Sequence, residues 1–384
     1  MIVRISLALL GLHALLALAS LTTACREPAV VPATAEKPVA EASADAQDDD
    51  GERRARAVAD ALVGRPGPAL AVTALDGRPI DLAALRGVKP VYLKFWATWC
   101  VPCREQMPGF AKIHAELGDR IEVLAVATGF ADDEAAVRAF RDEHGLTMPI
   151  VIDDGRLAAA VDLRVTPQHV VIGRDGRIVH VGHRDDRRLH DALAAAIAGD
   201  ASPPEVAGGP AAVEPRFAPG DRVGGLSLTT LDGRTHPLGA APDGRPTALM
   251  FFAPWCESYL ADSRPQTSQA CRRVREEVEV LAADGGVRWF AVAGGLWATG
   301  DDLEDYARTT TTRLPLALDA HGEILRAFSV RQIPAVALLD ADGRLARVLG
   351  PDDRGLADAL AAVRAAAAAD VREDMPEGAP RPSR

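Results

Sequence analysis

The sequence predicts an α/β protein of two tandem domains, each with a mixed central sheet flanked by helices. Three observations carry this prediction: an internal repeat, apolar stretches that alternate between strand-like and helix-like lengths, and Asp-Gly turns at matching places in both repeats. A chain of 384 residues is long enough for two or three domains. Its 48% hydrophobic and 25% charged residues are ordinary for a globular protein.

The internal repeat is visible in short motifs. The tetrapeptide Ala-Thr-Trp-Cys ending at Cys100 returns 156 residues later as Ala-Pro-Trp-Cys ending at Cys256, and an upstream Asp-Gly turn keeps the same offset. Further along, Pro167 matches Pro334 with an offset of 167 residues. The second repeat therefore carries additional residues between its cysteine and its proline.

The elements follow the same order in each repeat. An opening hairpin marked by Asp-Gly leads to a buried strand that ends at the Trp-Cys motif, followed by a long helix, a second buried strand and a further helix. In the first repeat these four elements cover residues 91–97, 104–117, 122–127 and 133–144. In the second repeat the later strand and helix cover residues 288–293 and 301–308. A proline-led strand, an Asp-Gly turn, a final strand and a C-terminal helix close each repeat, and the turn predicts an antiparallel hairpin.

The first residues predict an export signal. Arg4 precedes a mostly apolar stretch at residues 5–21, which is shorter than the ~20 residues of a membrane-spanning helix. Residues 21–25, Leu-Thr-Thr-Ala-Cys, resemble the lipobox of bacterial lipoprotein precursors, in which the cysteine is lipidated. We expect residues 1–25 to be a signal peptide and Cys25 to carry lipid. Ordinary cleavage that leaves Cys25 as a free thiol is the alternative.

Three other segments have the composition of linkers or tails. Residues 26–64 nearly lack large apolar side chains and are predicted to be a disordered linker. Residues 199–215 are rich in Pro and Gly and separate the repeats. Residues 367–384 are predicted to be a tail. The folded domains are then expected at residues 65–198 and 216–366.

The charge balance excludes one class of partner. A net charge of −11 argues against nucleic acid, because phosphate binding relies on a basic surface.

The most informative motif is Cys100-Val-Pro-Cys103, which lies between a strand-like and a helix-like stretch. Two cysteines at this spacing form either a redox pair or half of a zinc site. A zinc site needs a second pair or histidines at ligand spacing, and no such partner follows Cys103. The motif therefore favours redox chemistry.

Residues 95–108, Phe-Trp-Ala-Thr-Trp-Cys-Val-Pro-Cys-Arg-Glu-Gln-Met-Pro, resemble the active-site signature of a group of exported, membrane-tethered thiol-disulfide oxidoreductases. This group includes TlpA and ResA and has the thioredoxin fold. The resemblance covers about residues 66–198 and, in weaker form, residues 217–366. It implies two tandem thioredoxin-like domains, of which the second is degenerate.

The resemblance implies a role for each residue around the cysteines. An exposed Cys100 at a helix N-terminus would attack a substrate disulfide as the thiolate, and Cys103 would resolve the mixed disulfide. The redox-active Cys100–Cys103 disulfide is then the only redox group needed, with no separate cofactor or metal. Pro167 after Thr166 matches the cis-proline of the family. The residues implied to bind substrate are Trp99, Val101, Pro102, Thr166 and Pro167.

Three residues near the motif have two interpretations each. Thioredoxin has a buried acid at the place of Lys94; the lysine either stabilises a thiolate electrostatically or extends its amine to solvent, and we expect the latter. Glu105 either tunes the pair or is an ordinary acid in the first turn of a helix. Pro108 either kinks the active-site helix or simply breaks it.

The second repeat lacks the cysteine pair, because Tyr259 stands where the resolving cysteine is expected. Cys271 follows Cys256 by 15 residues, roughly 22 Å in a continuous helix and too far for a disulfide unless the helix breaks near Pro265. Three interpretations stay open: an inactive platform, a Cys256–Cys271 disulfide that is structural or redox-active, and a lone Cys256 nucleophile. Pro334 keeps the substrate-binding pattern, and we favour the platform.

The leading functional hypothesis is a periplasmic lipoprotein, tethered through Cys25, that reduces disulfides of exported proteins. The resemblance implies targets such as apocytochrome c or copper-site cysteines, and re-reduction by a membrane thiol reductant such as a DsbD- or CcdA-like donor. One alternative is a copper metallochaperone that uses Cys100, Cys103 and the nearby His169. Another is a peroxide-reducing enzyme that uses Cys256. The motif does not decide between reductase and oxidase.

Overall fold

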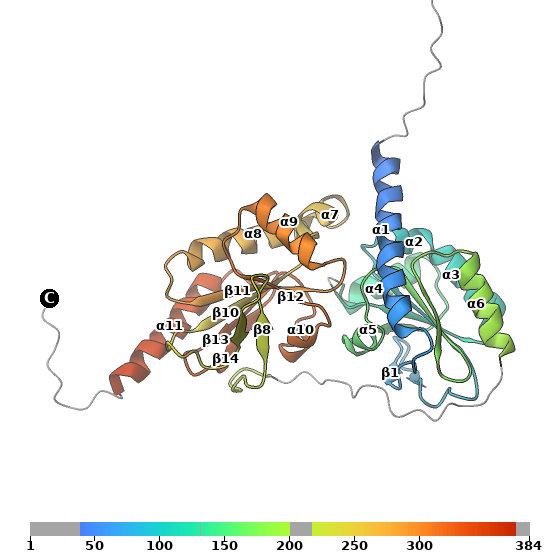
Figure 1. Cartoon of the computed structure of the whole chain (residues 1–384), viewed down its shortest axis with the longest axis horizontal. Coiled ribbons are helices and arrows are strands. Elements are labelled where there is room, and N and C mark those ends of the chain that lie inside the picture. Colours follow the sequence, from blue (N-terminus) through green and yellow to red (C-terminus); the bar gives the residue numbers. More distant parts are fainter. Residues whose placement is uncertain (1–38, 131, 200–216, 374–384) are drawn as a thin grey trace, which may run out of the picture. The chain divides into compact units, whose positions relative to one another are not determined.

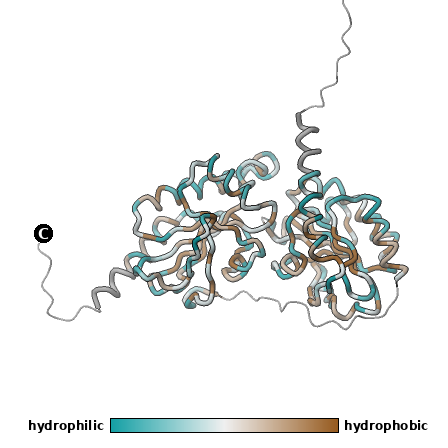
Figure 2. The backbone as a smooth tube through the Cα atoms, viewed as in Figure 1, coloured by the Kyte–Doolittle hydropathy of each residue, from teal (hydrophilic) through white to brown (hydrophobic). Residues whose placement is uncertain are grey.

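The computed structural model describes residues 39–130, 132–199 and 217–373, which form two domains after an N-terminal helix (Figure 1). Each domain contains one five-stranded mixed sheet flanked by helices and one two-stranded hairpin. The predicted fold class, α/β with two thioredoxin-like domains, is confirmed. Figure 2 shows the hydrophobic colour gathered along the central strands of the sheets.

The first sheet has the strand order β5-β4-β3-β6-β7. Its strands are β3 (Val91–Trp96), β4 (Glu122–Ala127), β5 (Ile150–Ile152), β6 (Gln168–Ile172) and β7 (Ile178–Gly182). β3, β4 and β5 run parallel, whereas β6 is antiparallel to β3 and β7 is antiparallel to β6. This order places β3, which leads into the Trp-Cys motif, at the centre of the sheet.

The second sheet has the equivalent order, β12-β11-β10-β13-β14, with the same strand directions. Its strands are β10 (Thr247–Phe252), β11 (Arg288–Gly294), β12 (Leu316–Asp319), β13 (Ala335–Leu339) and β14 (Leu345–Leu349). The opening hairpins, β1 (Ala71–Thr73) with β2 (Pro79–Asp81) and β8 (Ser227–Thr229) with β9 (Thr235–Pro237), also agree with the prediction.

The central strands are buried on both faces. In β3, Tyr92 and Trp96 pack into one apolar cluster, whereas Leu93 and Phe95 pack into another. Because successive strand side chains point to opposite faces, the two clusters lie on the two sides of the sheet. A nearly continuous apolar sequence is typical of a strand covered in this way.

The helices differ from the predicted set mainly in how they are divided. In the first domain they are α2 (Val101–Glu105), α3 (Met107–Leu117), α4 (Glu134–Glu143), α5 (Arg156–Ala160) and α6 (Arg187–Ala198). In the second they are α7 (Cys256–Ser263), α8 (Pro265–Ala282), α9 (Gly300–Thr310), α10 (Glu323–Ala327) and α11 (Leu356–Glu373). The helix predicted over residues 104–117 is two helices that meet at Gln106. Pro108 lies in the first turn of α3, where a missing backbone N–H is tolerated. β5, β12, α5 and α10 were not predicted, because segments of three to five residues show no readable periodicity.

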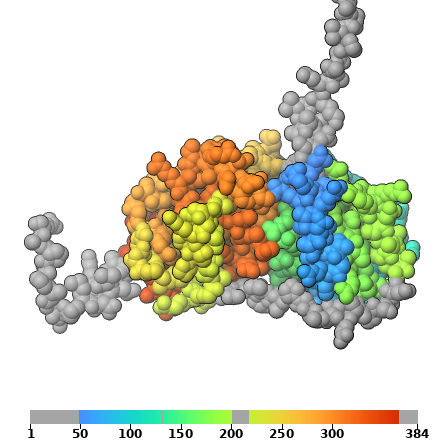
Figure 3. Space-filling model, in the orientation of Figure 1, coloured from blue at the N-terminus to red at the C-terminus, as the bar shows by residue number. Residues whose placement is uncertain are grey.

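The segment predicted to be a disordered linker contains helix α1 (Val39–Leu62). Ala55 and Val58 of this helix are buried, and Arg188 of α6 donates a hydrogen bond to Glu52 at 2.6 Å. Figure 3 shows the part of α1 that is drawn in blue lying on the surface of the first domain. The prediction of disorder was wrong for this helix, because a helix that packs through one narrow stripe of side chains needs few apolar residues.

Helix α11 continues to Glu373, so residues 367–373 are helical rather than part of a loose tail. The predicted signal peptide and Cys25 lie outside the described residues, as do almost all of the predicted interdomain linker and residues 374–384. Within the part of the chain that the structure describes, no helix is both long and apolar enough to cross a membrane.

Candidate active site

The site begins where β3 ends and α2 starts. Cys100 and Cys103 are joined by a disulfide with a Cα–Cα distance of 5.2 Å. Cys100 is the N-cap residue of α2, and its Sγ accepts a hydrogen bond from the Cys103 backbone N–H at 3.2 Å. Pro102 fits in this first turn because helical N–H groups there have no partner within the helix. The turn therefore presents the sulfur of Cys100 to backbone donors that would stabilise a thiolate.

A cis-proline loop lies directly against Cys100. The Thr166–Pro167 peptide bond is cis, as the resemblance implies, and Cys100 Sγ is 3.4 Å from the carbonyl oxygen of Thr166. His183 at the end of β7 holds this loop, since its Nδ1 donates to the Pro167 carbonyl oxygen at 2.7 Å. Sequence reasoning missed His183 because it lies 16 residues beyond the proline, directly after the strand that returns across the sheet.

The active-site surface is covered in this structure. Cys100 is 1% exposed and Trp99 is 2% exposed, whereas Val101 is 39% exposed. The expectation that Cys100 is exposed is therefore wrong for this arrangement of the chain. The covering residues come from the second domain, which adjacent sequence motifs cannot reveal.

Three side chains of the second domain make this cover. The indole rings of Trp99 and Trp255 lie 5.0 Å apart between centroids. The Val101 backbone N–H donates to the Tyr259 hydroxyl at 3.3 Å. Trp297 Nε1 donates to the Thr166 side-chain oxygen at 3.2 Å.

Lys94 lies in the middle of β3 and is fully buried, so the expectation that its amine reaches solvent is wrong. Its Nζ has no hydrogen-bond partner among the described residues and lies 5.3 Å from the centre of the Phe110 ring. Burial lowers the pKa of Lys94 to about 7, and Asp185 opposes the shift. Because Tyr92 and Trp96 share this face of β3 with Lys94 and pack into the cluster that holds Cys103, the amine lies on the cysteine side of the sheet.

A buried hydrogen-bond network surrounds His169, the register partner of Lys94. Its Nδ1 lies 2.7 Å from the Tyr92 hydroxyl, and its Nε2 lies 2.8 Å from Gln106 Oε1. Burial lowers the pKa of His169 well below its ordinary value, and Lys94 adds to the effect, so the ring is neutral. In that state Nε2 donates to Gln106 and Nδ1 accepts from Tyr92. Both ring nitrogens are engaged, which leaves His169 no free nitrogen for a copper ion.

The second domain also contains a disulfide. Cys256 and Cys271 are bonded with a Cα–Cα distance of 6.4 Å, because α7 ends at Ser263 and α8 starts at Pro265. The Ser268 hydroxyl donates to the Glu257 carbonyl oxygen at 2.7 Å and holds the two helices together. Of the three interpretations, the structure shows the Cys256–Cys271 disulfide, so the lone Cys256 thiol is wrong. The inactive platform stays a prediction, because a disulfide is compatible with it. Ile333–Pro334 is a second cis peptide bond.

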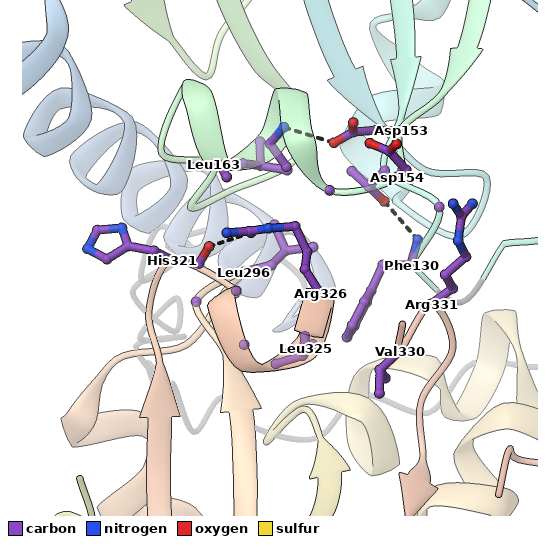
Figure 4. A pocket seen from close by; sticks show the side chains of 18 of the residues that line it. Phe130, Asp153, Asp154, Leu163, Leu296, His321, Leu325, Arg326, Val330 and Arg331 are labelled. Carbon is purple, nitrogen blue, oxygen red and sulfur yellow. Dashed lines mark hydrogen bonds between the residues drawn. The ribbon is translucent and has the colours of Figure 1, made fainter. Parts of the chain in front are cut away.

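A cavity of about 190 Å³ lies apart from the cysteines (Figure 4). Its apolar wall includes Phe130 and Leu296, and Asp153 stands at its edge. Burial raises the pKa of Asp153 to about 6, while the N–H groups of Leu157 and Ala158 donate to its carboxylate. Asp153 therefore caps α5 and has a structural role. Neither Cys100 nor Cys103 lines this cavity, so it is not the redox site.

The first domain is similar to known redox proteins. Residues 63–181 match the AhpC/TSA family. The chain is 35% identical over 133 residues to the thioredoxin-like protein YneN of Bacillus subtilis, which covers 34% of this chain and 78% of that protein. It is 31% identical over 132 residues to the thiol-disulfide oxidoreductase ResA of Bacillus subtilis, which covers 33% of this chain and 72% of that protein. A solved structure of a secreted disulfide oxidoreductase of Mycobacterium tuberculosis is 26% identical, with a TM-score of 0.30, and covers 33% of this chain and 96% of that one. The chain belongs to the thioredoxin-like family of thiol-disulfide oxidoreductases.

Proposed function

We propose that this chain reduces disulfides of exported proteins, with Cys100 as the nucleophile and Cys103 as the resolving cysteine. The observation that carries the proposal is the Cys100–Cys103 disulfide at the start of α2, beside the cis peptide bond before Pro167. The relative ResA of Bacillus subtilis, which is named as a thiol-disulfide oxidoreductase, supports the same chemistry.

The reaction starts from the dithiol form. The Cys100 thiolate attacks one sulfur of a substrate disulfide, forms a mixed disulfide and releases the other substrate sulfur as a thiolate. The Cys103 thiolate then attacks Cys100 Sγ, which releases the second substrate sulfur and leaves Cys100 and Cys103 oxidised. Two electrons pass from the pair to the substrate, and a membrane thiol reductant, such as a DsbD- or CcdA-like donor, restores the dithiol.

The residues around Cys100 suit an extended substrate segment. The Thr166 carbonyl oxygen lies beside the reacting sulfur, so a peptide strand placed there would hydrogen-bond to the backbone at Thr166. Trp99, Val101, Pro102 and Pro167 would border that strand. Apocytochrome c and copper-site cysteines are the substrates that we propose.

The apolar segment at residues 5–21 and the motif at Cys25 support a periplasmic location with a lipid tether. A secreted solved relative agrees with a place outside the cytoplasm. Mass spectrometry of the mature N-terminus tests this proposal, because a diacylglycerol on Cys25 adds a defined mass. An unmodified thiol there would contradict it.

The direction of electron flow is tested by the reduction potential of the purified chain against glutathione. A potential below about −230 mV supports a reductase, and one near −120 mV would show an oxidant instead. Substrate reduction is then measured for Cys100→Ser, for which we expect a loss on the order of 1,000-fold. Glu105→Gln, one turn away on α2, is the matched control and should retain activity.

The two alternative functions find less support. A copper site would need His169, whose ring nitrogens are already hydrogen-bonded. A peroxide-reducing enzyme would need a free Cys256 thiol, and Cys256 is bonded to Cys271.

A further inference from the structure

Equivalent residues of the two domains meet each other. Trp99 and Trp255, which occupy the same place in the two Trp-Cys motifs, pack with ring centroids 5.0 Å apart. Their indole N–H groups donate to equivalent loops, Trp99 to the Phe130 carbonyl oxygen at 2.8 Å and Trp255 to the Leu296 carbonyl oxygen at 3.0 Å. The contact therefore joins the two faces on which the Trp-Cys motifs lie.

Each of these two loops also packs a side chain against an apolar cluster of the other domain. Phe130 of the first domain packs against an apolar cluster of the second, and Leu296 of the second packs against a cluster of the first. Arg164 beside the first cis-proline loop donates to the Ala320 carbonyl oxygen at 2.8 Å. This reciprocity resembles the two-fold contact of a homodimer, in which each patch meets its own equivalent.

Both disulfides belong to this contact. Cys100, Cys103, Cys256 and Cys271 all lie in one cluster of buried apolar residues. Tyr259, three residues after Cys256, accepts a hydrogen bond from the N–H of Val101, the residue after Cys100. The two cysteine-bearing turns are therefore in direct contact.

The turn at Cys256 shares a backbone hydrogen bond with the turn at Cys100, although Cys100 is the N-cap of α2 and Cys256 is the first residue of α7. Cys256 N–H donates to the Ala253 carbonyl oxygen at 3.0 Å, and Cys100 N–H donates to the equivalent Ala97 oxygen at 3.2 Å. Each of these cysteines lies at a helix start, and each domain has a cis X–Pro bond in the equivalent loop. The second domain thus keeps the arrangement of a thiol-disulfide site, with its partner cysteine on α8.

We propose that Cys256–Cys271 is a second redox centre and that it exchanges electrons with Cys100–Cys103 inside the chain. Cys100 is 1% exposed and Cys256 is 0% exposed, so in this arrangement neither is open to an outside protein. Instead, both lie in the same buried cluster, and the turns that carry them are in contact. The proposal rests on the thiol-disulfide chemistry proposed above for Cys100 and Cys103.

The exchange needs no reactant beyond the dithiol donor already named. The Cys100 thiolate attacks Cys256 Sγ, which forms a Cys100–Cys256 disulfide and releases Cys271 as a thiolate. The Cys103 thiolate then attacks Cys100 Sγ, which restores Cys100–Cys103 and releases Cys256. Two electrons move from the first pair to the second, and the proton lost by Cys103 is balanced by one gained at the new thiols.

The test follows the redox state of each pair in the full chain. Fully oxidised protein is treated with a limited amount of dithiothreitol, quenched with acid at short times, and labelled with two isotopic forms of an alkylating reagent that distinguish thiols from former disulfides. We expect Cys100→Ser to slow reduction of Cys256–Cys271 by about 100-fold, because the intramolecular partner acts at a high effective concentration. Lys112→Ala, at an exposed position on α3, is the control and should leave this rate near that of the wild type.

A second variant traps the intermediate. With Cys103→Ser and Cys271→Ser together, Cys100 and Cys256 should form a disulfide under mild oxidation, seen as a linked peptide pair by mass spectrometry. The matched variant Cys100→Ser with Cys271→Ser should not link Cys103 to Cys256.

Two results would overturn the exchange: equal rates of Cys256–Cys271 reduction in wild type and Cys100→Ser, or no linked peptide. If Cys100–Cys103 itself fails to reduce a protein disulfide such as insulin, the proposed function fails separately.

Discussion

The two domains share one fold but hold their disulfides in different ways. In the first domain the disulfide closes within a single helical turn, between Cys100 and Cys103. In the second, Tyr259 occupies the place of Cys103, and Cys256 reaches Cys271 across the break between α7 and α8. The comparison shows that this fold keeps a cysteine at the first position of its active-site turn while its partner comes from a different place.

The buried surroundings of the two central strands differ as well. In the first domain Lys94 and His169 lie side by side in register, and the second domain has Met250 and Val336 as the equivalent pair. The fold therefore does not need buried polar groups at these places. In the first domain Lys94 and His169 both lie on the face of the sheet that packs into the cluster containing Cys103.

The largest expected effect comes from giving the first domain the apolar residue of the second. Lys94→Met removes an amine whose pKa is about 7 in the folded chain and 10.5 ordinarily. Folding favours the neutral form of an amine whose pKa it lowers. Wild type is therefore destabilised most below pH 7, by about 5 kcal/mol, and not at all above about pH 10.5. We expect the variant to be more stable at pH 6 and the difference to shrink as the pH rises from 7 to 10.5.

Denaturant unfolding at several pH values measures this difference. The exposed Lys112 provides the control, since Lys112→Met should show no such pH dependence. A pH-independent difference between Lys94→Met and wild type would mean that the amine keeps its ordinary pKa.

A smaller effect is expected at the second disulfide. Replacing both Cys256 and Cys271 by Ala should cost about 3 kcal/mol, because the bond closes a loop of about 15 residues. The tighter loop between Cys100 and Cys103 should contribute less, about 2 kcal/mol by the same relation. Hydrogen exchange of peptides from β10 and β11 reports the stability of the second domain directly. Unchanged protection in the double variant would show that the bond adds no stability.

The smallest effect concerns the contact between the two turns. Tyr259→Phe removes the hydroxyl that accepts from the Val101 N–H, which should weaken the contact by about 1 kcal/mol. A change of about 1 kcal/mol corresponds to roughly a five-fold larger population of the form in which the second domain does not cover Cys100. Cys100–Cys103 should therefore react faster with an outside protein disulfide by a similar factor. Stopped-flow mixing with insulin measures the rate. A slower reaction than in wild type would show that the Tyr259 hydroxyl promotes exchange instead of covering the site.

Local pattern was enough to predict a large part of the first domain. The strand predicted at residues 122–127 coincides with β4, and the helix predicted at residues 133–144 contains α4 with its flanking cap residues. The cis bond at Pro167 followed from the resemblance. These features depend on side chains within a few residues of each other, and a motif records such neighbours directly.

The sequence by itself determined the repeated α/β fold and the Cys-Val-Pro-Cys turn after a central strand, because apolar periodicity and turn residues act locally. The tertiary structure decided what surrounds that turn. The burial of Lys94, the cover over Cys100 and the Cys256–Cys271 bond all depend on segments brought together from distant parts of the chain or across a helix break. Such contacts arise from the packing of complementary surfaces. A short stretch of sequence contains only one of the two surfaces that meet in such a contact.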